Sequence, residues 1–287
     1  MFKIFGVRQG MIGDSIMALP ILNYLDQKYS NSYKYWCIGK KFSQSSPLYI
    51  SQKLIDKIWI LENDELMGKK DLEEAKKCDL FINPNPQHPG PEDWWNYFSC
   101  VEETFRMAGF DIKEFHQMEN HHKKPKLEPW FKYQNYANTI AVWPFAHYGK
   151  DPRRNPTPQW WNILLKEIES VYKFNIFHFG AENEPDLGEG LKNYKKLTHL
   201  SFFDMIKITL GCNLSIGTDS GSSWVIGAYG IPQINILTKW MPYHIRNFNA
   251  FSPENYLNNK IDHISLTGTD GIAQIDVINS ISNIKSI

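Results

Sequence analysis

The chain has 287 residues, with 31 Lys and Arg balancing 31 Asp and Glu, so its formal net charge is zero. Its length suggests two α/β-sized domains or one large one. A hydrophobic content of 42% with 22% charged residues excludes wholesale disorder. Neutral charge disfavours a protein built to coat nucleic acid, although a local basic groove stays open.

The four cysteines form no CxxC pair and no Cys/His spacing of a zinc site. We expect reduced, buried thiols, as in a cytosolic protein. The apolar start of the chain is too short for a signal sequence and carries Lys3 in its middle. No apolar run reaches the ~18 residues of a membrane span. We therefore predict a soluble, cytoplasmic protein.

Short apolar strands alternate with amphipathic helices in the first half of the chain. The predicted strands are Lys3–Val7, Lys34–Ile38, Lys57–Leu61 and Asp79–Asn83. One helix is expected over Asp14–Lys28, where apolar residues recur at helical spacing, and another over Asp93–Met107. This alternation is typical of parallel α/β folds.

The segment His116–Pro129 is polar and lacks periodicity, which indicates a linker. The alternation then restarts. The predicted strands are Thr139–Trp143, Asn175–Phe179, Leu214–Gly217 and Gln233–Leu237. The predicted helices are Pro158–Tyr172, Phe202–Leu210, Ser222–Tyr229 and, approximately, Ile272–Ile284.

Two such series predict an α/β fold of two Rossmann-like domains, 1–130 and 131–287, with parallel sheets facing a central cleft. Two placements stay open for the last helix, within the second domain or packed back on the first.

The first candidate site follows the first predicted strand. Gly10 and Gly13 permit a tight turn before the helix. Ligands of open α/β folds bind at this carboxyl edge of the sheet, so Arg8, Gly13 and Asp14 are candidates for substrate contact. The alternative is that Asp14 or Ser15 only caps the helix.

The loop that precedes the helix Pro158–Tyr172 carries Lys150, Arg153 and Arg154 between prolines. A guanidinium fork suits phosphate oxygens, and a pyrophosphate needs more than one such contact. The loop is therefore a candidate phosphate site, with a solvated basic loop as the alternative.

Two acidic segments follow strands of the second domain. Glu182 and Glu184 can accept hydrogen bonds from ribose hydroxyls or act as an acidic cap. The segment Asp219-Ser220-Gly221 leads from a strand into a short helix, whose first N–H groups would converge on an anion. A plain turn with an N-cap is the alternative.

Histidines give weaker signals. His88 follows a strand and can meet a substrate, although a surface loop is the plainer interpretation. His121 and His122 lie in the linker without carboxylate neighbours at ligand spacing, so we predict no metal site.

Taken in order, these segments resemble the heptosyltransferase-like glycosyltransferases of family nine. The stretch Gly13–Pro20 is similar to the N-terminal Gly-Asp…Leu-Pro signature of that family. Asp219–Gly221, followed by Ala228–Pro232, is similar to its C-terminal Asp-Ser/Thr-Gly…Ala-Leu-Gly-Val-Pro signature. Arg153–Pro156 and Gly180–Glu184 fall where its donor-binding loops lie. The resemblance covers most of the chain and implies a GT-B fold.

The resemblance implies inverting, metal-independent transfer of a heptose or related hexose from a nucleoside diphosphate sugar to a hydroxyl group. It makes Asp14 the general base that deprotonates this hydroxyl, and it keeps Arg8, Gly13 and His88 on the acceptor side. The implied phosphate-binding residues are Lys150, Arg153, Arg154, Asp219, Ser220 and Gly221. Glu182 or Glu184 would hold the ribose.

One position departs from the family pattern. Trp224 stands on the short helix where the family commonly has His, so the resemblance does not identify the donor sugar. Trp224 itself is a candidate contact for the donor.

The implied partners are a nucleotide-sugar donor, with no further cofactor or metal, and a glycan, lipid-linked or protein acceptor. Nucleic acid is disfavoured. We expect a monomer or weak dimer in the cytoplasm, with a peripheral position at the inner membrane face as an option. The alternative functions are an epimerase or hydrolase on the same fold, and a nucleotide-sugar-binding protein without transfer activity.

Overall fold

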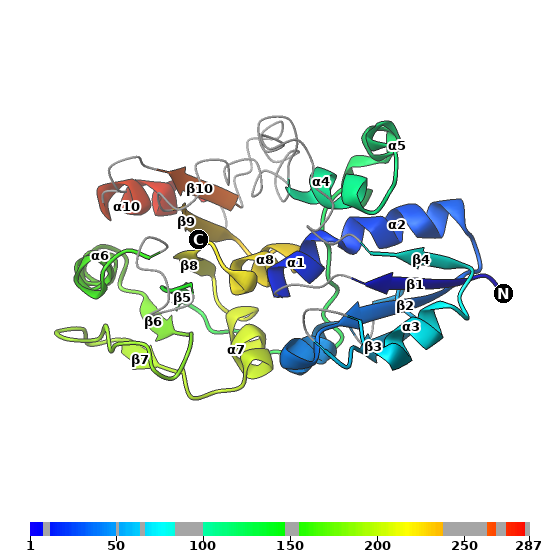
Figure 1. Cartoon of the computed structure of the whole chain (residues 1–287). Coiled ribbons are helices and arrows are strands. Elements are labelled where there is room, and N and C mark those ends of the chain that lie inside the picture. Colours follow the sequence, from blue (N-terminus) through cyan, green and yellow to red (C-terminus); the bar gives the residue numbers. More distant parts are fainter. Residues whose placement is uncertain are drawn as a thin grey trace. The chain divides into compact units, whose positions relative to one another are not determined.

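The structure, a computed structural model, describes residues 1–7, 12–49, 52–63, 67–83, 100–146, 155–237, 263–267 and 274–284. The chain divides into two compact units, Met1–Trp130 and Phe131–Ile287, and each is built on a parallel sheet (Figure 1).

The sheet of the first unit has four parallel strands in the order β3-β2-β1-β4. These strands are β1 (Lys3–Val7), β2 (Tyr33–Ile38), β3 (Lys57–Ile60) and β4 (Leu80–Ile82). The helices of this unit are α1 (Ile12–Met17), α2 (Leu19–Lys28), α3 (Lys69–Ala75), α4 (Cys100–Met107) and α5 (Ile112–Gln117). Two 3₁₀ segments accompany them, η1 (Lys40–Leu48) and η3 (Asn120–His122).

Both faces of this sheet meet helices. Phe5, Tyr35 and Cys37 pack in one cluster with Ala75 of α3. Side chains alternate along a strand, so Lys34 lies on the opposite face, where its ammonium group pairs with Asp26 of α2 at 2.8 Å.

The predicted helix Asp14–Lys28 is two helices, because α1 ends at Met17 and α2 begins at Leu19. Pro20 is in the first turn of α2. Proline has no backbone N–H and clashes with the preceding turn, so it starts a helix better than it continues one.

The second unit has six parallel strands in the order β10-β9-β8-β5-β6-β7. The strands are β5 (Thr139–Trp143), β6 (Asn175–His178), β7 (Tyr194–Lys196), β8 (Leu214–Thr218), β9 (Gln233–Leu237) and β10 (His263–Thr267). The helices are α6 (Pro158–Tyr172), α7 (Phe202–Thr209), α8 (Gly221–Ala228) and α10 (Gln274–Asn283).

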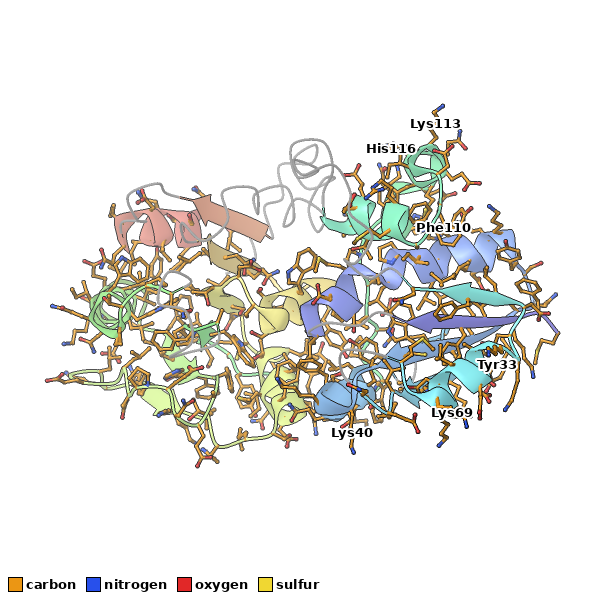
Figure 2. The ribbon with its side chains drawn as sticks, viewed as in Figure 1. Tyr33, Lys40, Lys69, Phe110, Lys113 and His116 are labelled. Atoms are coloured by element: carbon orange, nitrogen blue, oxygen red, sulfur yellow. The ribbon has the colours of Figure 1, made fainter. Side chains whose placement is uncertain are left out.

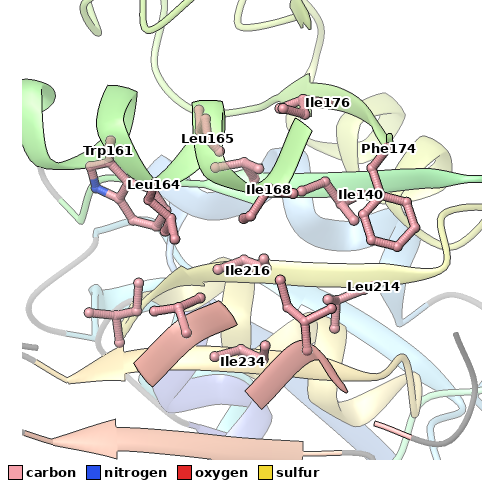
Figure 3. Packing of buried hydrophobic residues seen from close by; sticks show 14 of the residues in the cluster. Ile140, Trp161, Leu164, Leu165, Ile168, Phe174, Ile176, Leu214, Ile216 and Ile234 are labelled. Atoms are coloured by element: carbon pink, nitrogen blue, oxygen red, sulfur yellow. The ribbon is translucent and has the colours of Figure 1, made fainter. Parts of the chain in front are cut away.

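The core of the second unit lies between α6, α10 and one face of this sheet (Figure 3). Ile140, Ile176, Ile216 and Ile234 line that face from four strands, and each is fully buried. The opposite face meets α7, because the Trp143 indole donates a hydrogen bond to the Thr209 hydroxyl at 3.3 Å. With both faces covered, every residue of β5 and β8 is buried.

The last helix contributes to the core of the second unit. Val277 and Ile281 of α10, together with Ile284, join the cluster formed by α6 and the sheet.

The remaining differences concern short or polar elements. The predicted polar linker contains the end of α5 and the whole of η3, and β7, β10, α3 and η1 were not predicted. The expected helix residues 93–99 and 272–273 lie outside the described residues. None of the helices in the described part of the chain combines the length and apolar character of a membrane span.

Candidate functional site

The sheet of the second unit changes direction between β5 and β8. The chain adds β6 and β7 on one side of β5, then returns to add β8, β9 and β10 on the other side. In open parallel sheets, ligands bind beyond the carboxyl ends of the two strands that flank this reversal. The loops that leave β5 and β8 there are two of the predicted donor segments.

The turn from β8 into α8 presents backbone N–H groups at this edge. The Ser223 hydroxyl accepts a hydrogen bond from the Ser220 N–H at 3.0 Å and donates one to the Ser220 carbonyl at 2.7 Å. N–H groups of a first helical turn have no intrahelical acceptor and attract anions. The turn therefore suits a phosphate group, and Ser223, which shapes it, was missed by the sequence analysis.

The residues just before α8 have different environments. Asp219 is half-buried, whereas Thr218 is fully buried and its hydroxyl has no hydrogen-bond partner among the described residues. Gly217 allows β5 and β8 to approach, because a Cβ atom there would lie 2.8 Å from the Trp143 carbonyl oxygen.

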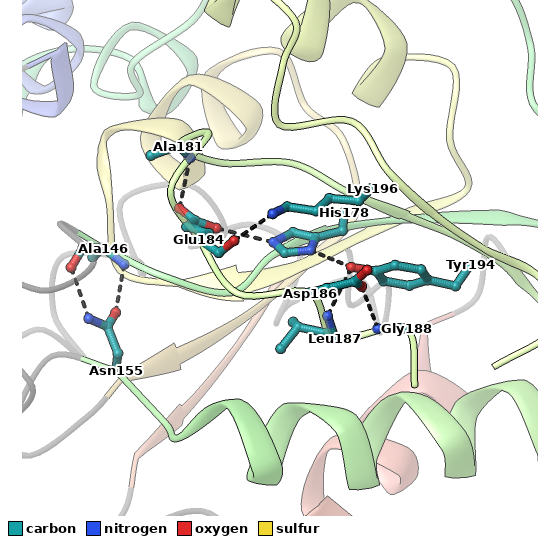
Figure 4. A network of polar contacts seen from close by, with 10 residues as sticks. All are labelled: Ala146, Asn155, His178, Ala181, Glu184, Asp186, Leu187, Gly188, Tyr194 and Lys196. Atoms are coloured by element: carbon teal, nitrogen blue, oxygen red, sulfur yellow. Dashed lines mark hydrogen bonds and ion pairs between the residues drawn. The ribbon is translucent and has the colours of Figure 1, made fainter. Parts of the chain in front are cut away.

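The basic loop after β5 is described only at its base. Lys150, Arg153 and Arg154 lie outside the described residues. The Asn155 side chain accepts a hydrogen bond from the Ala146 N–H at 2.6 Å and donates one to the Ala146 carbonyl at 3.0 Å (Figure 4). This paired contact joins the two ends of the loop beside the carboxyl end of β5. Its role was not predicted, because the sequence does not show that residues 146 and 155 meet.

Glu184 is committed to contacts inside the second unit (Figure 4). Its carboxylate accepts a hydrogen bond from the Ala181 N–H at 2.8 Å and lies 3.1 Å from His178 Nε2. The side chains of His178 and Glu184 are 0% and 3% exposed. Glu182 is exposed, so of the two predicted ribose contacts only Glu182 presents its side chain to solvent.

A buried chain of polar groups continues from Glu184. A carboxylate only accepts hydrogen bonds, so His178 Nε2 donates to Glu184, and His178 Nδ1 lies within hydrogen-bond distance, 2.6 Å, of the Tyr194 hydroxyl. Burial raises the pKa of Tyr194, which keeps its hydroxyl protonated. This chain ties the loop after β6 to β7.

Asp14 occupies the corresponding position in the first unit. Its sheet reverses between β1 and β4, and α1 follows β1. Asp14 is half-buried, whereas its neighbours Gly13 and Ser15 are buried. Asp14 and Ser15 are the third and fourth residues of α1, so the alternative that either of them is the N-cap is wrong.

The other predicted residues divide as follows. Arg8 and His88 lie outside the described residues. Trp224 lies in α8 with only 4% of its surface exposed, which leaves little of its indole for contact with a donor. The described candidates are thus Asp14 with Gly13 in the first unit, and Glu182, Asp219, Ser220 and Gly221 in the second.

A cavity of about 170 Å³ lies beside α2 in the first unit, lined by Leu19, Leu22, Asn23 and Lys126 among others. Ligand pockets usually measure ~300–1,000 Å³. None of the predicted site residues lines this cavity, so we assign it no ligand.

One group of described side chains has the composition of a metal site. Glu119, His121 and His122 each offer one ligand atom, and these atoms lie within 4.8 Å of one another. The expectation that the His pair lacks a carboxylate neighbour at ligand spacing is therefore wrong, because η3 brings Glu119 beside it.

No protein-family model and no curated protein matches the sequence. Solved structures match almost the whole chain. The Escherichia coli ADP-heptose LPS heptosyltransferase II matches with a TM-score of 0.71 and 13% identity, over 98% of this chain and 98% of that chain. The E. coli heptosyltransferase WaaC with ADP matches with a TM-score of 0.66 and 12% identity, over 98% of this chain and 99% of that chain.

A glycosyl transferase of family 9 from Veillonella parvula DSM 2008 matches with a TM-score of 0.67 and 12% identity, over 99% of this chain and 90% of that chain. At this level of identity the likeness shows the fold. The chain has the GT-B fold, and the predicted α/β architecture of two Rossmann-like units with parallel sheets is confirmed.

Proposed function

We propose that the protein is an inverting glycosyltransferase that moves a sugar from a nucleoside diphosphate donor to a hydroxyl group of an acceptor. The observation that carries this proposal is the Asp219-Ser220-Gly221 turn, which opens α8 at the reversal point of the second sheet. The GT-B fold shared with heptosyltransferases supports the same reaction class. We assign the donor to the second unit and the acceptor to the first.

Departure of the diphosphate requires stabilisation of the negative charge that grows on it. In this proposal the first-turn N–H groups of Gly221 and Ser222 and the cations Lys150, Arg153 and Arg154 supply that stabilisation. Such groups make a metal ion unnecessary for the step, and we propose that transfer is metal-independent. Glu182 hydrogen-bonds the ribose.

Asp14 acts as the general base. A carboxylate that accepts the proton of the acceptor hydroxyl makes its oxygen a stronger nucleophile as it attacks the anomeric carbon. Attack from the face opposite the leaving diphosphate inverts the configuration at that carbon. The half-buried position of Asp14 in the first turn of α1 leaves part of its surface accessible to a substrate.

The nucleotide is tested first by a thermal-shift comparison of ADP, UDP, GDP and CMP, because a ligand that binds the folded state raises the melting temperature. ADP is our first candidate, since one of the matching heptosyltransferases contains it. ADP-heptose and ADP-hexoses then serve as donors with a panel of sugar acceptors, with and without EDTA. We expect acceptor-dependent release of ADP that EDTA does not reduce.

The Asp14→Asn variant tests the mechanism. We expect the transfer rate to fall by about 10²–10⁴-fold, the usual contribution of a general base, with ADP binding unchanged. Glu73→Gln is the matched control, because Glu73 is an exposed carboxylate on α3 of the same unit. Full activity of Asp14→Asn would remove Asp14 from the mechanism.

The same assays separate the alternatives. Free sugar formed from donor alone identifies a hydrolase, and a changed sugar on the recovered nucleotide identifies an epimerase. Donor binding without turnover over the whole acceptor panel identifies a binding protein. Each of these results would replace the transferase proposal.

A further inference from the structure

We propose that Glu119, His121 and His122 form a binding site for a divalent transition-metal ion of the Zn²⁺ type. Their three ligand atoms lie within 4.8 Å of one another. A tetrahedral zinc ion with bonds of about 2.0–2.1 Å holds its ligand atoms roughly 3.3 Å apart. Small side-chain rotations at an exposed turn are enough to close that difference.

The two imidazole rings converge although they belong to adjacent residues. Successive side chains on a 3₁₀ helix point about 120° apart. The ring centroids of His121 and His122 are nevertheless only 3.9 Å apart, with their planes inclined at 56°. A carboxylate oxygen of Glu119 lies 3.3 Å from His121 Nδ1. Three ligand groups, two from η3 and one from its N-cap residue, therefore already meet at one place.

Residues of α2 hold this turn from behind. Asn23 donates a hydrogen bond to the His122 carbonyl at 2.9 Å, and the Gln27 amide contacts His122 Nδ1. This contact occupies Nδ1 of His122, so Nε2 is the ring nitrogen that remains available to a metal.

The donor set selects the kind of ion. Two imidazoles and one carboxylate suit Zn²⁺, Ni²⁺ or Cu²⁺ better than Mg²⁺ or Ca²⁺, which prefer oxygen ligands alone. Three protein ligands leave a fourth position for water. The exposure of the side chains, 64% for His121 and 72% for Glu119, indicates an ion that exchanges with solvent.

A metal ion here would be structural. It would cross-link η3 internally and, through Asn23 and Gln27, fix it on α2. None of the residues assigned to sugar transfer belongs to the cluster, so the site does not depend on the proposed function. Binding to the folded chain raises its stability in proportion to the logarithm of the ion concentration above the dissociation constant.

The test is a Zn²⁺ titration of the untagged, chelator-treated full chain by isothermal calorimetry. We expect one equivalent bound, a raised melting temperature, and at least a tenfold loss of affinity in the double variant His121→Ala/His122→Ala. His116→Ala is the matched control, because His116 lies on the neighbouring α5, is exposed and pairs with Glu102 rather than with the cluster (Figure 2). It should bind Zn²⁺ as the native chain does.

Substitution with Co²⁺ gives a second readout. A bound Co²⁺ ion should show visible absorption bands that the double variant lacks. Equal Zn²⁺ affinity of the native chain and the double variant, or no binding by the native chain at all, would overturn the proposal. Loss of transfer activity alone would bear on the proposed function and not on this site.

Discussion

At the scale of single residues, Glu182 and Glu184 illustrate how two neighbouring carboxylates acquire different roles. Both follow β6, and the sequence gives them equal standing as ribose contacts. Gly180 has a φ of +154°, and a Cβ atom there would overlap the Glu184 carboxylate. The loop therefore turns Glu184 inward to His178 and leaves Glu182 outside. Residue spacing alone does not reveal that turn.

Two substitutions distinguish the structural role of Glu184 from the proposed ribose contact of Glu182. Glu184→Ala leaves the Ala181 N–H and the buried His178 Nε2 without their acceptor, so we expect the free energy of unfolding to fall by about 1–3 kcal/mol. Glu182→Ala should leave stability unchanged and weaken ADP binding roughly tenfold, as loss of a charge-assisted hydrogen bond does. Urea unfolding and calorimetry measure the two effects. Native ADP affinity in Glu182→Ala would remove its ribose role.

At the scale of elements, the best-predicted segments carry clear boundary signals. The helix α6 was predicted over its observed bounds. In the structure Thr157 caps its start by accepting a hydrogen bond from the Trp160 N–H at 3.2 Å. The strands β5 and β9 also match their predicted bounds. The missed strand β7 has three residues, two of them lysines, and no such signal.

The turn at η3 was missed for a different reason. Its residues are polar and show no periodicity, so their composition indicates a linker. The contacts that fix them come from Asn23 and Gln27, about a hundred positions earlier in the chain. A local reading of sequence has no access to partners at that separation.

The close approach of β5 and β8 gives a prediction for the sheet. A methyl group at position 217 would meet the Trp143 carbonyl oxygen at 2.8 Å, so Gly217→Ala must push the two strands apart. Overpacking of this kind costs about 1–3 kcal/mol. We expect a lower melting temperature. We also expect weaker ADP binding, because Gly217 lies two residues before the Asp219-Ser220-Gly221 turn that leads into α8.

Gly230→Ala is a useful comparison for Gly217→Ala. Gly230 has a φ of +74°, with open space where its Cβ would stand. The strain caused by Gly230→Ala is purely conformational, and the residue follows the C-terminal end of α8. Gly230→Ala should therefore lower stability without the loss of ADP affinity expected of Gly217→Ala. Equal ADP affinity in both variants would contradict the position of the donor at the β5–β8 reversal.

At the scale of the whole molecule, the order of the motifs was the informative feature. Gly13-Asp14 after the first strand and Asp219-Ser220-Gly221 in the second half indicated two Rossmann-like units of a GT-B fold, which the solved structures confirm. The roles of these residues are not fixed by the fold, because the same fold serves many functions. Those roles stay predictions.

The assignment of the donor to the second unit predicts where a nucleotide slows hydrogen exchange. ADP at about 100 times its dissociation constant stabilises the state that binds it by ~2.7 kcal/mol. Peptides that cover β8 and α8 should therefore exchange more slowly with ADP, because the N–H groups of the first turn of α8 then donate to phosphate oxygens. Peptides of α2 and β2 in the first unit should change little.

The variant Arg153→Ala should need more ADP for the same protection, since it lacks one phosphate contact. Slower exchange in the first unit without any change at α8 would reverse the assignment of donor and acceptor to the two units. It would also contradict the role of Asp14 as the general base.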